Sequence, residues 1–133
     1  MKPLHQIKAG VIGTGFIGPV HIEALKRLGI QVAAVCGSTK SATAVADRFG
    51  IPQVFGDYDY KKMIRESGVD VIHITSPNKD HFAQAKAVMA AGLHCVCRIN
   101  AHAARFQTVG IGVALITKRI IFGRVDGCGR QTC

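Results

Sequence analysis

The sequence is poor in several features that mark particular classes of protein. It has no tryptophan, only 6% aromatic residues, and 8 acidic side chains against 17 basic ones. It also lacks a long apolar run: the most apolar window, 109–117, is too short to span a bilayer and is followed by Lys118 and Arg119. No stretch has the layout of a secretory signal. We therefore expect no membrane segment and a cytoplasmic location.

Cysteine is present, but not in a disulfide pattern. Five cysteines are an odd number without framework spacing, which indicates reduced thiols in a reducing compartment. No familiar zinc-ligand spacing is formed by the candidate ligands His94, Cys95, Cys97, His102, Cys128 and Cys133. We therefore expect no metal site.

Acidic residues are scarcest near the C-terminus. The net charge is +9, and residues 98–133 carry six basic side chains but a single acidic one. A basic tail can attract nucleic acid. This tail has only two aromatic residues, Phe106 and Phe122, and no nucleic-acid motif. We therefore expect the basic side chains of the tail to be solvated. If the tail did bind nucleic acid, the binding would be sensitive to salt and would be lost when residues 98–133 are deleted.

Against these absences stands one strong motif, a G-x-G-x-x-G run that reads Gly13-Thr14-Gly15-Phe16-Ile17-Gly18. It follows an apolar strand over 7–12 and leads into an amphipathic helix over 20–28, which is the context that a dinucleotide fingerprint requires. The first glycine allows a tight turn, the second lets the backbone touch a pyrophosphate, and the third permits close helix–strand packing. The helix N-terminus adds free N–H groups. The alternative is a glycine-rich turn without a ligand.

The rest of the first 97 residues alternates between strand and helix signals. Strands are expected over 30–36, 52–55, 69–75 and 93–97, and helices over about 41–49, from Asp57 or Asp59 to about 68, and over 80–91. Gly50 and Gly92 are helix stop signals. Right-handed crossovers turn this order into an α/β fold, a doubly wound parallel sheet of Rossmann type with strand order 3-2-1-4-5.

Several of these segments carry a family resemblance. Residues 9–18, Val32-Ala33-Ala34-Val35-Cys36 and Ala46-Asp47-Arg48-Phe49-Gly50-Ile51 resemble the N-terminal half of the Gfo/Idh/MocA oxidoreductases. Thr75-Ser76-Pro77-Asn78-Lys79-Asp80-His81 and residues 90–97 complete the match, in family order and spacing. The resemblance covers residues 5–97. It implies NAD or NADP as cofactor and an oxidoreductase that transfers hydride to or from a sugar, a cyclitol or a related polyol.

The resemblance also implies which residues touch the cofactor. The pyrophosphate would lie on residues 13–17, and the adenosine ribose on the loop after Cys36, which reads Gly37-Ser38-Thr39-Lys40. The region near the nicotinamide would be formed by Thr75, Pro77, Asn78 and His81. For His81 the alternative is a surface histidine. His73 lies inside an apolar strand, and we expect it to be a satisfied buried histidine rather than a catalytic one.

The choice between the two cofactors is read from the end of the second strand. NAD-binding folds place an acidic side chain there, about 20 residues after the glycines, to bind the ribose 2′-OH. Residues 37–40 contain no carboxylate, while two hydroxyls and Lys40 could hold a 2′-phosphate. This pattern favours NADP and leaves NAD open. The alternative is that Ser38 and Thr39 are only turn and N-cap residues and Lys40 a solvated charge.

The resemblance stops after Cys97. Family members continue with Glu-Lys-Pro, whose lysine is the usual catalytic group, but this chain reads Arg98-Ile99-Asn100. No residue here is therefore assigned as catalytic. Nothing after it resembles the family's second, substrate-binding domain. We expect a dinucleotide-binding domain over 1–97 and an atypical basic tail over 98–133, with self-association through an exposed sheet edge that the missing domain would otherwise protect.

A shift of reading frame is one account of the tail. With suitable codons, residues 102–110 read one base later give Met-Pro-Leu-Asp-Ser-Lys-Gln-Ser, which is what the family would have there. The rival account is a genuine short variant whose 109–122 segment supplies a replacement strand or helix. Two functions follow: an NAD(P)-dependent oxidoreductase that is catalytically incomplete as this chain stands, or a module that binds a dinucleotide without turnover.

Overall fold

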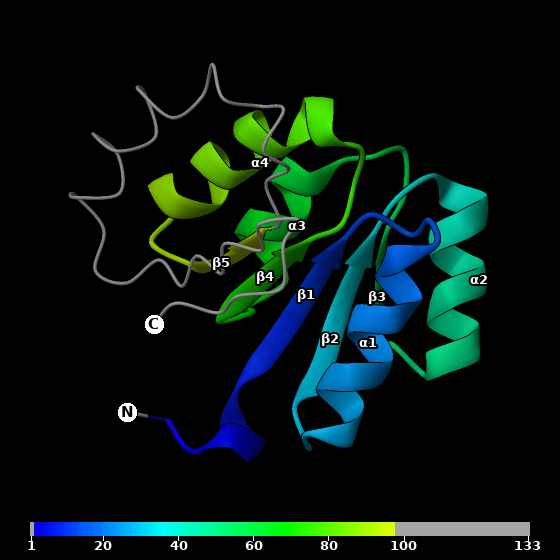
Figure 1. The fold of residues 1–133 in the computed structure, drawn as a ribbon, viewed down its shortest axis with the longest axis vertical. Coiled ribbons are helices and arrows are strands. Elements are labelled where there is room, and N and C mark those ends of the chain that lie inside the picture. Colours follow the sequence, from blue (N-terminus) through cyan, green and yellow to red (C-terminus); the bar gives the residue numbers. More distant parts are fainter. Residues whose placement is uncertain (1, 98–133) are drawn as a thin grey trace, which may run out of the picture.

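The fold was obtained as a computed structural model, which describes residues 2–97. Figure 1 shows a sheet with helices on both sides. In chain order the elements are η1 (Leu4–Gln6), β1 (Lys8–Ile12), α1 (Ile17–Arg27), β2 (Gln31–Cys36), α2 (Thr39–Phe49), β3 (Gln53–Phe55), α3 (Tyr60–Glu66), β4 (Val71–Ile74), α4 (Asn78–Ala90) and β5 (His94–Cys97). The sequence predicts all of them except the short 3-10 turn η1. The predictions for residues 98–133 lie outside the described residues.

The five strands form a single parallel sheet in the order β3-β2-β1-β4-β5. This confirms the expected topology. The order reverses direction between β1 and β4, because the chain runs outward from β1 to β3 and then crosses back. In open α/β sheets, ligands bind at this switch point, beyond the carboxyl ends of the strands.

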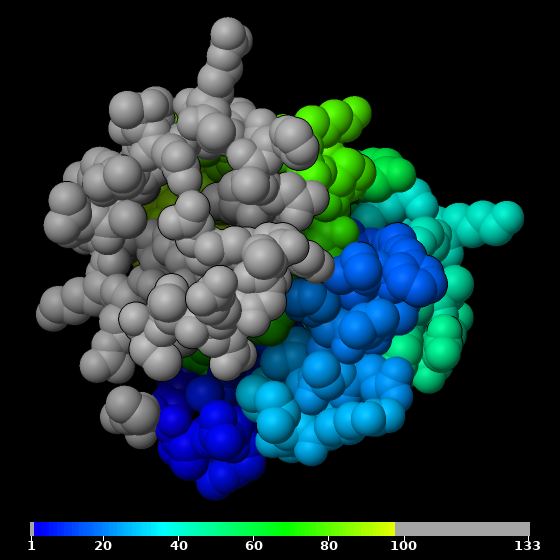
Figure 2. Space-filling view, viewed as in Figure 1, coloured from blue at the N-terminus to red at the C-terminus, as the bar shows by residue number. Residues whose placement is uncertain are grey.

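Two apolar clusters hold the helices against the sheet. On one face, Val11 and Val35 pack with Ile22 of α1 and Val45 of α2. On the other face, Ile72 and Ile74 pack with Met63 of α3 and Val88 of α4. Because successive strand residues point to opposite faces, the near-continuous apolar strands are buried on both sides. Figure 2 shows α1 and the segment after it, blue to cyan, on the molecular surface.

Three helices begin earlier than the sequence predicts. α1 begins at Ile17 rather than at residue 20, α2 at Thr39 rather than at about residue 41, and α4 at Asn78 rather than at Asp80. Prolines are compatible with the starts of α1 and α4: Pro19 lies in the first turn of α1, where its missing N–H costs nothing, and Pro77 stands just before α4. The starts of α1 and α4 matter because they bring the N-termini of these helices to the edge of the sheet where a ligand would lie.

Candidate functional site

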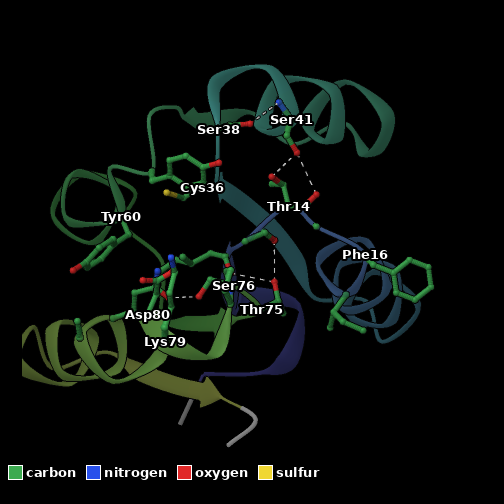
Figure 3. A pocket seen from close by; sticks show the side chains of 18 residues that line it. Thr14, Phe16, Cys36, Ser38, Ser41, Tyr60, Thr75, Ser76, Lys79 and Asp80 are labelled. Atoms are coloured by element: carbon green, nitrogen blue, oxygen red, sulfur yellow. Dashed lines mark hydrogen bonds between the residues drawn. The ribbon is translucent and has the colours of Figure 1, made fainter. Parts of the chain in front are cut away.

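A cavity of about 810 Å³ lies at the carboxyl ends of the strands, around the switch point between β1 and β4. Figure 3 shows its wall, with Ser38, Ser41 and Thr14 on one side and Lys79 and Asp80 on the other. The lining residues are Ile12, Gly13, Thr14, Gly15, Phe16, Ile17, Cys36, Ser38, Ser41, Tyr58, Tyr60, Thr75, Ser76, Pro77, Lys79, Asp80, Ala83 and Gln84.

Gly13 makes the β1–α1 turn possible. Its φ of +106° is a conformation that side chains rarely adopt, and a Cβ on this residue would lie 2.5 Å from the backbone N of Ser76. The Gly13 N–H donates to the carbonyl of Cys36 at the end of β2. The turn is therefore pressed between the ends of β2 and β4, and no side chain fits there.

Gly18 and Gly15 differ from each other in what surrounds them. A Cβ on Gly18 would collide with the carbonyl oxygen of Gly13, so this glycine lets α1 pack tightly against the turn. A Cβ on Gly15 would meet nothing within 4 Å. Neither protein packing nor backbone conformation therefore requires Gly15 to be a glycine. The open space above it is where a ligand would approach the backbone.

Hydroxyl groups join the turn to α2. Ser38 is the N-cap of α2 and accepts a hydrogen bond from the Ser41 N–H. The Ser41 hydroxyl lies 2.6 Å from Thr14 Oγ1 and 3.2 Å from the Thr14 carbonyl oxygen (Figure 3). Thr14 also packs against Gly37, where a Cβ would collide with its hydroxyl. Ser38 is thus an N-cap residue, as one of the two sequence interpretations holds, and it also lines the cavity.

A carboxylate reaches the loop after β2 from another part of the chain. The Thr39 hydroxyl donates to Asp57 Oδ1 at 2.8 Å, and the Asp57 N–H donates to Thr39 Oγ1 at 3.2 Å. Asp57 and Tyr58 have positive φ values of 52° and 57°, and the Tyr58 N–H donates to the Gly37 carbonyl. The sequence argument for NADP considered only residues 37–40, which hold no carboxylate, and the structure adds the Asp57 carboxylate beside Thr39. The acidic residue comes from the β3–α3 loop, which a search limited to residues 37–40 does not reach.

The β4–α4 loop forms the other wall. The Thr75 hydroxyl donates to the Gly13 carbonyl at 2.9 Å and lies 3.1 Å from that of Ile12. The next residue, Ser76, donates through its hydroxyl to Oε1 of Gln84 at 2.5 Å. Gln84 is only 7% exposed. These bonds fix the loop both to the glycine turn and to the second turn of α4.

His81 is buried and supports this loop from behind. Its exposed fraction is 8%, so it is not the surface histidine of the alternative interpretation. Nε2 lies 2.5 Å from the Ser76 carbonyl oxygen, and because a carbonyl only accepts, Nε2 carries the proton. Nδ1 then accepts from the Cys97 thiol at 3.3 Å. Burial raises the pKa of the Cys97 thiol to about 11, so the thiol stays protonated and able to donate.

His73 has a partner that the sequence did not indicate. Its Nδ1 lies 3.0 Å from Nδ1 of His21 on α1, and the two rings meet edge to face. Burial lowers the pKa of His73 to about 4, and the neighbouring His21 adds to the effect. Burial also lowers the pKa of His21. Neither ring lines the cavity. The pair joins α1 to β4, in agreement with a satisfied histidine rather than a catalytic one.

The cavity brings together only part of the set of residues expected from the sequence. Those that line it are Gly13, Thr14, Gly15, Phe16, Ile17, Ser38, Thr75 and Pro77, while Gly18, Gly37, Thr39, Lys40, Asn78 and His81 are not among its lining residues. The sequence argument missed Ile12, Cys36, Ser41, Tyr58, Tyr60, Ser76, Lys79, Asp80, Ala83 and Gln84. A helical spacing of three and four among residues 80, 83 and 84 was the available signal for one face of α4.

Two classes of feature are not found among residues 2–97. That part of the chain holds no group of three or more histidine, cysteine or acidic side chains arranged to bind a metal ion. It also has no helix that is long and apolar enough to cross a membrane.

Comparison with known proteins agrees with the geometry of the site. The chain is 35% identical over 95 residues to an inositol 2-dehydrogenase of Salmonella paratyphi B, covering 68% of this chain and 28% of that protein. It is 30% identical over 104 residues to a D-xylose 1-dehydrogenase (NADP(+)) of Haloferax volcanii, covering 77% of this chain and 31% of that protein. The chain thus spans less than a third of the length of either relative.

A solved structure shares the fold. An oxidoreductase from Agrobacterium radiobacter, crystallised in complex with NAD+, is similar with a TM-score of 0.63 and 28% identity, covering 69% of this chain and 27% of that one. A profile of the oxidoreductase family with an NAD-binding Rossmann fold matches residues 7–98. Through these residues, with their glycine turn and parallel sheet, the chain belongs to the Gfo/Idh/MocA oxidoreductase family.

Proposed function

We propose that this chain binds NAD or NADP across the carboxyl ends of its strands. The single observation that carries the proposal is the contrast among the three glycines of the turn. Gly13 and Gly18 are in contact with protein backbone, whereas Gly15 faces open space within the cavity. A turn that needs only two of its glycines for folding keeps the third for the close approach of a ligand, and free N–H groups at a helix N-terminus favour a phosphate.

The proposed contacts follow the cavity from its centre outward. The pyrophosphate lies on residues 13–17, at the N-terminus of α1. The adenosine ribose lies by Ser38, with Gly37, Thr39 and Lys40 forming the loop around it. On the β4–α4 side, Thr75, Pro77 and Asn78 lie toward the nicotinamide. His81 acts there through the loop, because its ring holds the Ser76 carbonyl.

We propose that the reaction is dehydrogenation of a polyol. The support is that the matching relatives are named as inositol and xylose dehydrogenases. When bound, the dinucleotide supplies hydride exchange with an alcohol carbon of the substrate. The chain's own described residues bind and orient the cofactor. A second candidate is a binding module without turnover, which the sequence Cys97-Arg98-Ile99-Asn100 favours because it lacks the family's lysine.

The test compares two glycine variants in the full chain. NADH and NADPH are titrated into the wild-type protein and into Gly15→Ala, with binding followed by calorimetry. An added methyl group meets no protein atom within 4 Å, so the melting temperature should stay unchanged. Affinity should fall by about ten- to a hundredfold, which corresponds to the loss of one charge-assisted hydrogen bond to a phosphate.

The outcomes separate the two candidate functions. Binding that Gly15→Ala weakens supports the cofactor site, and turnover of myo-inositol or D-xylose would then support the enzyme over the binding module. A wild-type chain that binds neither dinucleotide contradicts the proposal. So does a Gly15→Ala variant that is folded and binds as tightly as the wild type.

Three further proposals concern the chain as a whole. The first is that the dinucleotide-binding domain ends at residue 97. The second is that the protein is cytoplasmic, and the third is that copies of this chain associate through β5. This last proposal rests on topology, since β5 is an edge strand of the sheet in residues 2–97 and an unpaired edge is a template for another strand. Sedimentation velocity over a range of concentrations tests it: a concentration-independent monomer would contradict self-association.

A further inference from the structure

One pair of metal-binding side chains lies outside the cavity. His21 in the second turn of α1 and His73 in β4 hold their Nδ1 atoms 3.0 Å apart, with the two rings edge to face. The two residues are 52 positions apart in the sequence, so the packing of α1 on the sheet brings them together. Neither ring lines the cavity. The pair is therefore a separate feature of the fold, and the proposed binding of a dinucleotide does not use it.

The surroundings of the pair keep both imidazole rings neutral. Burial lowers the pKa of His73 to about 4, with a contribution from His21, and burial also lowers the pKa of His21. In the sheet, His73 is paired with two apolar residues, Val11 of β1 and Val96 of β5. Among the hydrogen bonds and ion pairs of residues 2–97, none joins a carboxylate to either ring. Neutral imidazole is the form that binds a metal ion, so neither ring has to lose a proton at neutral pH.

The separation of the two rings is close to that of two ligands on one metal ion. Zinc binds imidazole nitrogen at about 2.0–2.1 Å, and tetrahedral angles then place two such nitrogens about 3.3 Å apart. The two Nδ1 atoms are 3.0 Å apart, so an opening of about 0.3 Å and a rotation of the rings would admit the ion. In the pair without metal, one Nδ1 donates its proton to the other. When the ion binds, that proton moves to Nε2 of the same ring, which leaves a lone pair on each Nδ1.

We propose that His21 and His73 form a two-histidine site for a divalent transition-metal ion of the zinc type. The two Nδ1 atoms are the protein ligands, and water completes the coordination. The described residues add no third histidine, cysteine or acidic side chain to this pair, so the ion is held less tightly than in a structural zinc centre and exchanges with solution. A bound ion ties α1 to β4 two residues before Thr75, whose hydroxyl bonds the Gly13 carbonyl of the glycine turn.

The experiment titrates Zn²⁺ into the metal-free full chain at neutral pH, with the ring nitrogens followed by NMR and the affinity by calorimetry. The Nδ1 resonances of His21 and His73 should shift together and saturate at one ion per chain, while those of the exposed His94 stay in place. His73→Gln leaves a single ligand, so affinity at the pair should fall by about tenfold or more. His94→Gln removes an exposed histidine, is the matched control and should bind as the wild type does.

Other results would overturn the inference. A wild-type chain in which Zn²⁺ leaves both Nδ1 resonances unchanged contradicts the site. Undiminished affinity in a folded His73→Gln variant would place the ion elsewhere, for example on cysteine thiols, and contradicts it as well. Should that variant fail to fold, His21→Gln, which alters the less buried ring, takes its place, and undiminished affinity there contradicts the proposal. If neither variant folds, the wild-type resonances decide the question.

Discussion

The turn after β1 is built differently from the loops after β2 and β3. The β1–α1 turn is shaped by backbone against backbone, with Gly13 pressed on Ser76 and Gly18 on Gly13. The loops after β2 and β3 are joined by a backbone bond, from the Tyr58 N–H to the Gly37 carbonyl, and also by side chains, through Thr39 and Asp57. Phosphate is recognised by backbone N–H groups and is common to all dinucleotides, whereas hydroxyl and carboxylate groups can distinguish one ribose from another. Substitutions should therefore disrupt folding at the turn and alter selectivity at the neighbouring loops.

The largest effect is expected at the turn. Gly13→Ala places a methyl group 2.5 Å from the Ser76 nitrogen and forces alanine into a φ of +106°. We expect a loss of about 3 kcal/mol or more in the free energy of unfolding, measured by denaturant titration. Gly15→Ala in the same turn is the control, because its methyl group meets no atom. Equal stability of the two variants would contradict a turn built by backbone contact.

Acid should lower the stability of the fold through the His21–His73 pair, which joins α1 to β4. The pKa of His73 is about 4 in the folded chain against its usual 6.5, so as the pH falls from 6.5 toward 4 the unfolded chain binds a proton that the native chain does not. Stability should fall over this range by about 1–2 kcal/mol, a figure discounted for partial exposure of the ring. Thermal unfolding from pH 7 to pH 4 measures this change. His73→Val should flatten the profile, and an unchanged slope in that variant would assign the acid sensitivity to other groups.

Cofactor selectivity should change at the side-chain loops. Asp57→Asn removes the carboxylate that Thr39 holds beside the ribose end, so affinity for NADPH relative to NADH should rise about tenfold as repulsion of the 2′-phosphate is lost. The ratio is obtained by calorimetric titration with both cofactors. Asp47→Asn removes the same charge from an exposed position on α2 and should leave the ratio unchanged. An equal shift in both variants would mean that net charge, rather than the loop, sets the preference.

The smallest effect is expected where the two kinds of loop meet. Ser41→Ala removes the hydroxyl that joins α2 to Thr14, and we expect a loss of about 0.5–1.5 kcal/mol in unfolding free energy. Thr43→Ala serves as control, since the hydrogen bond that its hydroxyl makes within residues 2–97 stays inside α2, to the Thr39 carbonyl. If the control loses as much stability as Ser41→Ala, the Ser41 contact with Thr14 contributes nothing of its own.

The regular elements of residues 2–97 were largely predictable, because their signals are local. Apolar runs in β1, β2 and β4 fixed the strands, Gly50 ended α2 in a left-handed conformation as predicted, and Asp59, one of two candidates, caps α3. The starts of α1 and α4 were less well predicted. Proline is permitted in a first helical turn as well as before one, so Pro19 and Pro77 did not set the boundary by themselves.

The candidate site was predictable only in part. The glycine motif predicted the turn between β1 and α1, since its backbone requires a glycine at Gly13 and at Gly18. The carboxylate of Asp57 was missed, because it stands 18 residues from its partner Thr39 along the chain. The family resemblance implied His81 beside the cofactor; the structure shows its Nε2 against the Ser76 carbonyl, a contact that the sequence did not indicate.

The sequence by itself determined the alternation of strands and helices, the parallel sheet and the place of the glycine turn, because these depend on periodicity and on the conformational freedom of single residues. Only the tertiary structure decided which polar groups meet. It brought Asp57 to Thr39, joined His21 to His73, and bonded Ser76 to Gln84. Such pairs depend on how elements pack against one another, and no local pattern of residues encodes that distance.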